Sequence, residues 1–251
     1  MSNNEKQTNN ETRDSFTSKT GFILACIGSA VGMGNIWLFP YRVGQFGGAA
    51  FLIPYLIFII LLGYTGLMGE FAFGRMTQTG PIGSFKKALE TKNKKWGGIL
   101  GAIPVLGAFG IAVGYAVVVG WFLRFLVGFI TGSAMASSDS ALYFGEIAGP
   151  FGSIIWHIIA LIIVSIILVS GVAKGIEIMN KIMMPAFYIL FIIVMVRVFM
   201  LDGAIDGLKY LVVPDWASLA EPKTWIYALG QAFFSLSLAG SGMIVYGSYL
   251  K

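Results

Sequence analysis

The chain has 251 residues, of which 57% are hydrophobic and 12% charged, and its formal net charge is +5. A soluble domain of this length needs far more charged surface, so this composition, with a mean hydropathy of +0.80, indicates an integral membrane protein. The single cysteine, Cys26, excludes an internal disulfide. The basic residues gather in loops between apolar runs, and this distribution argues against nucleic-acid binding.

Residues 1–20 are polar and contain no Leu, Ile or Val, so we interpret them as a cytoplasmic amino-terminal tail. Residues 21–251 are the predicted transmembrane domain, and its first span covers about residues 21–43. This span contains Gly28-Ser-Ala-Val-Gly-Met-Gly-Asn35 in its middle. Glycine costs a helix about 1 kcal/mol per residue relative to alanine, so unwinding here is inexpensive. Unwound backbone inside a bilayer needs protein or a wet cavity around it, so the segment predicts an ion or small-solute site.

Five further apolar runs are long enough to cross a hydrocarbon core of about 30 Å. The loops at 74–97 and 171–181 are rich in lysine, whereas those at 132–150 and 202–224 together carry six acids and two lysines. The positive-inside rule therefore predicts six spans with both termini in the cytoplasm. The five later spans cover about residues 49–73, 98–131, 151–170, 182–201 and 225–250.

The last span repeats the irregularity of the first, since Leu238-Ala-Gly-Ser-Gly242 lies in its middle. Two interrupted spans in corresponding places predict a binding site near the membrane midplane. The alternative is close helix packing, because Gly28 and Gly32 form a small-xxx-small pair of the kind common in helix bundles. We expect no enzyme, because the spans carry no acid–base pair, partnered nucleophile or metal cluster. We interpret the lone His157 as a packed or hydrogen-bonded residue.

Several stretches in order along the chain resemble the neurotransmitter:sodium symporter family, specifically its bacterial amino-acid transporters. The resemblance implies an all-α integral membrane protein of the bacterial leucine transporter-like fold, with six transmembrane helices of which the first and sixth are discontinuous. The chain would then contain the first five-helix repeat and the start of the second, inverted repeat. The matching stretches are Gly28–Trp37 with Phe39–Tyr41, Gly47–Tyr55, Gly69–Arg75, Tyr115–Trp121, Lys174–Glu177 with Lys181–Pro185, and Gly230–Leu238.

The resemblance implies two sodium sites in the unwound part of the first span. The carbonyl of Ala30 and the side-chain oxygens of Asn35 and Ser235 would belong to one site. The carbonyls of Gly28 and Val31 would belong to the other. Hard oxygen ligands of this kind suit Na⁺. Tyr55, Gln231 and Ser235 stand where chloride-dependent relatives bind Cl⁻, and chloride use stays open.

An amino-acid site is implied beside the first sodium site. The amides of Met33 and Gly34 and the hydroxyl of Tyr115 would hold the substrate carboxylate, because a half-helix begins there with its positive end. The substrate ammonium group would be held by the carbonyls of Ala30, Phe234 and Ser235 and by the hydroxyl of Ser237. Phe234 and Tyr115 would close over the site. Gly240 stands where relatives have a larger residue, which predicts a roomy pocket for a bulky apolar amino acid.

Further residues receive gating roles by the same resemblance. Arg13 would form an inner latch, with Phe16 in place of the usual tryptophan. Glu70 would accept hydrogen bonds from loose amides of the broken sixth span. The usual outer-gate arginine is replaced by Leu38, and Arg42 is a candidate substitute.

The function expected from the resemblance is sodium-coupled symport of an amino acid or related zwitterion across the inner cell membrane by alternating access. The family has about twice as many spans, so we expect this chain alone to be inactive or incomplete. The alternative is a non-transporting membrane protein that pairs with a separate carboxyl-terminal half or with intact transporters. Expected partners are the amino-acid substrate, Na⁺, the lipid bilayer, and either that second half or another copy of the chain.

Overall fold

A computed structural model describes residues 15–137 and 139–250, and every regular element in these ranges is helical. The first predicted span folds as α1 (Lys19–Ala30), the short π-helix η1 (Gly34–Leu38) and α2 (Phe39–Gln45), with a bend of 54° between the two halves. The second span is one unbroken helix made of α3 (Ala49–Leu62), η2 (Gly63–Leu67) and α4 (Met68–Thr77). A short helix, α5 (Pro81–Glu90), leads into the long α6 (Gly97–Thr131).

The second half of the chain contains shorter helices and the second break. The predicted fourth span is α9 (Ile154–Val169), the fifth is η3 (Val172–Glu177) with α10 (Ile178–Phe199), and the sixth is α13 (Pro222–Ser235) with α14 (Gly242–Ser248). The all-helical fold with discontinuous first and sixth helices is therefore confirmed. The connecting segments also fold as helices: α7 (Ser133–Ala136), α8 (Ser140–Ala148), α11 (Ala204–Val212) and α12 (Trp216–Ala220).

Helix lengths separate the spans into two groups. Within the described residues, three helical runs are long and apolar enough to cross a membrane: Ala49–Thr77, Gly97–Thr131 and Val172–Phe199. The bent pair of α1 and α2 is also long and apolar enough when its two helices are taken together. The apolar helix α9 is shorter, with 16 residues. The fifth helix begins at Val172, earlier than the predicted span at residue 182, so Glu177 and Lys181 lie within the helix, where they pair with each other, and not in a loop.

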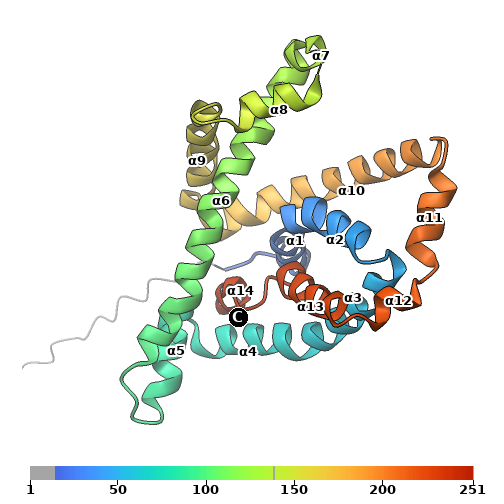
Figure 1. Cartoon of the computed structure of the whole chain (residues 1–251). Helices are drawn as coiled ribbons and strands as arrows, with labels where there is room; N and C mark the ends of the chain where they lie inside the picture. Colours follow the sequence, from blue (N-terminus) through green and yellow to red (C-terminus); the bar gives the residue numbers. More distant parts are fainter. Residues whose placement is uncertain (1–14, 138, 251) are drawn as a thin grey trace, which may run out of the picture.

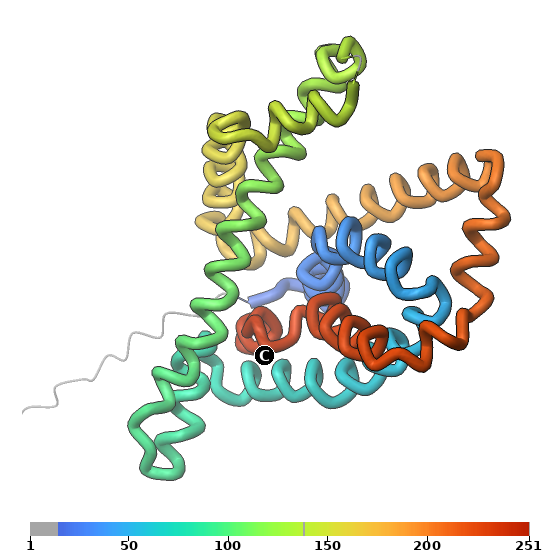
Figure 2. The backbone as a smooth tube through the Cα atoms, in the orientation of Figure 1, coloured from blue at the N-terminus to red at the C-terminus, as the bar shows by residue number. Residues whose placement is uncertain are grey.

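The broken helices lie in the centre of the molecule (Figure 1). The tube view shows α1 and α2 in blue beside α13 and α14 in red, with α6 along one side and α10 crossing behind (Figure 2). Aromatic and small residues of α2, α3 and α13 pack together: Val43, Phe46, Phe51 and Ala228 form a buried cluster. This cluster holds α2 and α13, one half of each broken span, against the second span.

Contacts at glycine residues hold α14, the other half of the sixth span, against α4 of the second span. A side chain at Gly74 of α4 would collide with the backbone carbonyl of Ile244 in α14. A side chain at Gly247 of α14 would likewise meet the backbone of Phe71, with the carbonyl oxygen 2.5 Å away. Two helices can approach this closely only where both lack side chains at the contact. The sequence therefore fixes α14 tightly on α4.

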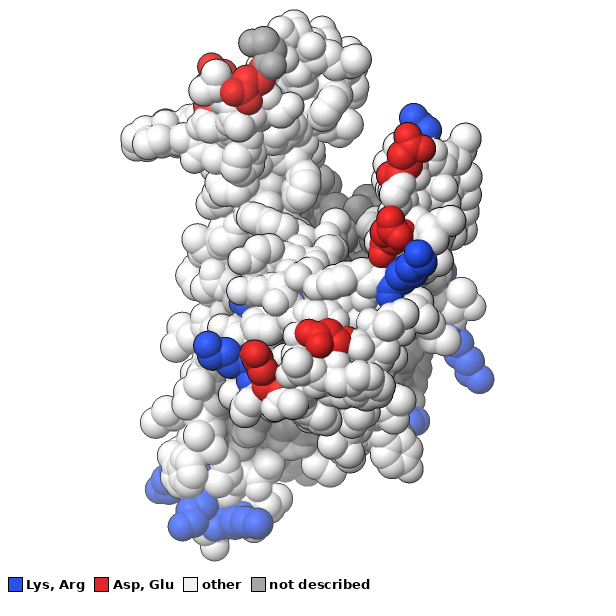
Figure 3. Space-filling model, turned by 45° about the vertical axis from the view of Figure 1, so that its right-hand side comes forward, with Lys and Arg blue, Asp and Glu red and all other residues white. Residues whose placement is uncertain are grey.

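Charged side chains are scarce on the surface. The face seen in Figure 3 is mostly uncharged, and Lys and Arg side chains gather at its lower end, where the α5–α6 hairpin lies. The exposed lysines of that hairpin are Lys86, Lys87, Lys92, Lys94 and Lys95. This charge distribution suits a protein whose apolar middle lies in lipid.

Candidate functional site

The break in the first span redirects two backbone amides. In an uninterrupted helix the Gly32 amide would reach the Gly28 carbonyl, but it donates instead to Ala30 O at 3.1 Å. The Asn35 amide would reach the Val31 carbonyl, but it donates to Gly32 O at 2.9 Å. The carbonyls of Gly28 and Val31 thereby lose their helical partners. These are the two carbonyls that the family resemblance implies for the second sodium site.

The break in the sixth span has an unusual backbone. Ser237, Ala239 and Ser241 have positive φ angles of 52°, 62° and 63°, a region that residues with side chains rarely adopt. The freed amide of Ala239 donates to Glu70 Oε1 at 2.9 Å. This is the type of contact expected for Glu70, whereas its second oxygen, Oε2, is buried and has no hydrogen-bond partner within the described residues. Strained backbone of this kind concentrates at functional sites.

A cluster of polar groups joins the two breaks, and we call it the Asn35 cluster: the Ala30 carbonyl with the side chains of Asn35, Ser235, Tyr55 and Gln231. Asn35 Nδ2 donates to Ala30 O at 2.7 Å, and Ser235 Oγ donates to Asn35 Oδ1 at 2.5 Å. Tyr55 and Gln231 donate to Ser235 Oγ at 3.1 Å and 3.3 Å.

The structure therefore brings together the three residues assigned to the first sodium site. It also brings Tyr55 and Gln231, the residues considered for chloride, to the same place. The oxygens come from a backbone carbonyl, an amide and a hydroxyl. Such neutral, hard oxygen atoms match the ligand chemistry of Na⁺.

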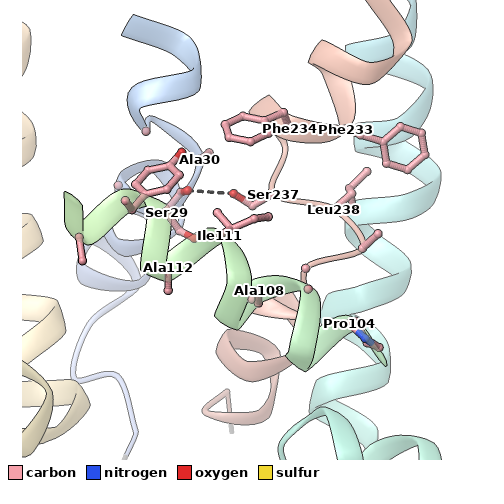
Figure 4. A pocket seen from close by; sticks show the side chains of 18 of the residues that line it. Ser29, Ala30, Pro104, Ala108, Ile111, Ala112, Phe233, Phe234, Ser237 and Leu238 are labelled. Carbon is pink, nitrogen blue, oxygen red and sulfur yellow. Dashed lines mark hydrogen bonds between the residues drawn. The ribbon is translucent and has the colours of Figure 1, made fainter. Parts of the chain in front are cut away.

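A second contact between the breaks lies deeper in the site. Ser237 Oγ donates to the Ser29 carbonyl at 2.8 Å, as the dashed line in Figure 4 shows. The Tyr115 hydroxyl faces the backbone amide of Gly34 and lies 3.1 Å from the position that a Cβ of Gly32 would take. The Phe234 ring covers Gly34 so closely that a side chain there would collide with it. Tyr115, Gly34 and Phe234 thus meet at the start of η1.

These groups border a cavity of about 970 Å³. Its wall consists of the two breaks and the apolar faces of α6 and α9, as Figure 4 shows in part. Among the predicted substrate and sodium residues, the lining includes Gly28, Ala30, Tyr115, Phe234, Ser237 and Gly240. Val31, Met33, Gly34, Asn35 and Ser235 lie outside the lining. An apolar cavity with a few polar groups at one end is typical of a small-molecule site.

Three further residues, Arg13, Phe16 and Arg42, belong to the gating positions expected from the sequence. Arg13 lies outside the described residues. Phe16, from the same motif, packs its ring against Phe22 and Tyr246, with centroid distances of 5.3 Å and 5.8 Å. Arg42, the candidate substitute for the outer gate, places its guanidinium 4.2 Å from the ring centroid of Tyr227. Arg42 of α2 therefore contacts α13, so it links one half of the first span to one half of the sixth.

Sequence reasoning gave no role to three residues that the structure places at these contacts. The Ser29 carbonyl joins the two breaks, Asn180 of α10 fills the space beside Gly28, and Glu177 is completely buried. A carboxylate four residues before a lysine at the edge of an apolar run was a signal for Glu177. His157 packs against Gly120 of α6, and its buried Nε2 has no hydrogen-bond partner within the described residues.

Comparison with known proteins gives consistent matches. Residues 13–138 and 138–251 match the family described as "Sodium:neurotransmitter symporter family". An "Uncharacterized sodium-dependent transporter YhdH" of Bacillus subtilis (strain 168) is 40% identical and aligns with 94% of this chain and 52% of its own length. The bovine (Bos taurus) "Sodium-dependent neutral amino acid transporter B(0)AT2" is 29% identical over 96% of this chain and 37% of its own length.

One solved structure shares both sequence and fold. It is described as "Crystal structure of MhsT in complex with L-phenylalanine", is 41% identical, and superposes with a TM-score of 0.85. The match covers 94% of this chain and 54% of that one. The chain thus spans about half the length of the relatives it matches.

Proposed function

Because this chain belongs to the sodium:neurotransmitter symporter family, we propose that it forms one wall of the Na⁺ and amino-acid sites of a sodium-coupled symporter. The observation that supports this proposal is the Asn35 cluster, in which oxygens from the two broken helices converge beside a cavity. Helix packing alone, the alternative left open by the glycines, needs no polar cluster of this kind.

In this proposal the cluster binds Na⁺ through the Ala30 carbonyl, Asn35 Oδ1 and Ser235 Oγ. The Ser235 hydroxyl now donates to Asn35, so it would rotate and present an oxygen lone pair to the ion. Tyr55 and Gln231 donate to the two lone pairs of the same oxygen, so one of these two hydrogen bonds would open as Na⁺ binds. The carbonyls of Gly28 and Val31 supply two ligands of a second ion.

The substrate would lie in the cavity with its carboxylate at the start of η1, near Met33, Gly34 and the Tyr115 hydroxyl. The positive end of the half-helix η1–α2 attracts that carboxylate. The ammonium group of the substrate would meet the carbonyls of the sixth-span break and the Ser237 hydroxyl. A carboxylate beside the Na⁺ would strengthen binding of both, which couples ion and substrate.

The substrate class follows from the cavity and from a relative. The cavity has room beside Gly240, because a Cβ atom added there would have the Ser237 carbonyl oxygen, at 4.0 Å, as its nearest neighbour. MhsT, with its similar fold, was solved with L-phenylalanine. We therefore propose a large apolar amino acid as substrate, with the amino terminus on the cytoplasmic side of the cell membrane.

The experiment that tests this proposal is uptake of radiolabelled phenylalanine into proteoliposomes under an inward Na⁺ gradient. The purified chain alone should show none, whereas the chain co-reconstituted with the second half of the Bacillus subtilis relative should take it up. Asn35→Ala should abolish that uptake. Equal uptake when K⁺ replaces Na⁺ would contradict sodium coupling, and robust uptake by the chain alone would contradict its incompleteness.

The alternative role, pairing without transport, has its own supporting observation. The chain aligns with 52% of one relative and 54% of another, so a partner carrying the remaining spans would complete the wall of the cavity. Affinity purification of the tagged chain with a co-expressed second half tests this pairing. A stable complex without Na⁺-driven uptake would favour the alternative over symport.

A further inference from the structure

Glu177, at the junction of η3 and α10, is a fully buried carboxylate outside the cavity. Its Oε2 accepts a hydrogen bond from the Thr17 amide at 2.7 Å. Its Oε1 accepts from the Thr17 hydroxyl at 2.6 Å, the Ser18 hydroxyl at 2.9 Å and Lys181 Nζ at 2.7 Å. Three of these four donors belong to the segment that precedes the first span, although this segment lies about 160 positions away in the sequence.

The same carboxylate also fixes the start of α1. Ser18 donates to Glu177 and simultaneously accepts the Gly21 amide at 3.0 Å as the N-cap of the helix. The carboxylate occupies the space that a side chain at Gly21 would need. Glu177 is therefore in contact with the first turn of α1 as well as with the residues before it.

The contact continues along one face of α1 toward the break. Ala25 is completely buried, and the Asn180 side chain occupies the space beside Gly28. Gly21, Ala25 and Gly28 lie on one face because helical neighbours recur every three or four residues. Figure 1 shows α1 next to α10. The position of the freed Gly28 carbonyl therefore depends on how α1 is held on α10.

Movement of α1 away from α10 would separate Glu177 from its donors on residues 17 and 18. Such a movement breaks three hydrogen bonds to a charged acceptor, which are stronger than hydrogen bonds between neutral groups. Glu177 thus opposes opening of the molecule at this end of the first span. The Lys181 bond lies within α10 and would survive such a movement.

We propose that Glu177 is a positioning residue that holds the inner half of the broken first span on α10 and so sets how often this end of the site opens. An effect of this opening on Na⁺ release would rest on the proposed function. The contact by which Glu177 holds α1 on α10 does not rest on it. The residue acts through Thr17 and Ser18 and touches neither ion nor substrate.

Amide hydrogen exchange of the full chain in nanodiscs tests the proposal. Glu177→Gln keeps the size of the side chain but weakens its bonds to Thr17 and Ser18, so exchange of amides 17–22 should accelerate on the order of tenfold to a hundredfold. Maleimide labelling of Cys26, the chain's single cysteine, should accelerate as well. The matched control is Glu90→Gln, because Glu90 also pairs with a lysine four positions away but is exposed, and it should change neither rate.

A double-mutant cycle separates holding from a general structural role. Thr17→Val removes one donor and should accelerate the same amides, and the double variant should exchange no faster than Glu177→Gln. Independent, multiplying effects would overturn the proposal, as would unchanged exchange in Glu177→Gln or equal acceleration throughout α6. If Glu177→Gln does not fold, the Thr17→Val variant alone tests the proposal. An exchange rate in Thr17→Val equal to that of the wild type would then refute the proposal. Failure of Na⁺-driven uptake would refute the proposed function and leave these exchange rates untouched.

Discussion

Asn35 and Ser235 are 200 positions apart in the chain, and their side-chain oxygens lie 2.5 Å from each other. Each stands at the edge of a break, Asn35 at the start of η1 and Ser235 at the end of α13. Their hydrogen bond joins two helices that are interrupted at the same level. The wall of the site is therefore held together by the same side chains that we propose as sodium ligands.

The Asn35 cluster should be sensitive to loss of the Ser235 hydroxyl. Ser235→Ala removes the acceptor of the half-buried Tyr55 hydroxyl and one of the three acceptors of Gln231, which keeps Gly34 O and Asn35 Oδ1, so the free energy of unfolding should fall by about 1–3 kcal/mol. Ser235→Thr keeps the hydroxyl and should stay within about 1 kcal/mol of the wild type. Thermal unfolding in detergent micelles measures both, with the exposed Ser140→Ala as the control. Equal stability of Ser235→Ala and wild type would show that the cluster does not join the breaks.

Glu70 should be needed for its oxygen and not for its charge. Glu70→Gln keeps an acceptor for the Ala239 amide and removes a buried charge whose Oε2 has no partner within the described residues. We expect its unfolding temperature to equal or exceed that of the wild type, whereas Glu70→Ala should lose about 1–3 kcal/mol. Hydrogen exchange of residues 236–242 should accelerate only in the alanine variant. If both variants lose stability equally, the negative charge itself stabilises the break.

Gly120 of α6 should not tolerate a methyl group. Gly120→Ala collides with the His157 ring and should destabilise the protein by about 1–3 kcal/mol, and His157→Ala should restore much of this loss. Gly110→Ala lies in the same helix with no neighbour within 4 Å, so it should be neutral or stabilising. Gly74→Ala should also destabilise the protein, but Ile244→Ala should not restore the loss, because the methyl group collides there with the backbone of Ile244 and not with its side chain. Unfolding temperatures of these variants are the measurement.

Gly240 should control the size of the bound amino acid if the proposed function is correct. Gly240→Phe fills the open space in the cavity, so binding of phenylalanine should weaken at least about tenfold relative to alanine. Competition against a radiolabelled amino acid, using the chain co-reconstituted with a second half, measures the ratio. Gly207→Phe, an equal change at an open position of α11, is the control. A preference for large substrates that survives Gly240→Phe would place the substrate side chain elsewhere.

The sequence was most informative where local chemistry decides structure. Long apolar runs predict helices because backbone groups in lipid must bond within their own segment. Glycine in the middle of Gly28–Asn35 predicts a break because it weakens a helix wherever it stands. The helical connections α8 and α11 were not predicted, because short amphipathic segments between apolar runs have no strong signal of their own.

The site itself was only partly accessible from residues alone. Motifs assigned oxygens to Ala30, Asn35 and Ser235, but they could not show that Tyr55 and Gln231 bond to the same hydroxyl. Glu177 received no role, because its burial depends on Thr17 and Ser18 folding back onto α10.

The sequence by itself determined the class of the protein, the helical segments and the positions of the two breaks, since these follow from apolar length and glycine content along the chain. The tertiary structure decided which freed groups meet. Ser237 reaches Ser29, Ser235 reaches Asn35, and Glu177 reaches Thr17 only when helices distant in sequence pack together. Periodicity within one helix carries no information about its rotation against another, and that rotation decides which polar groups share a site.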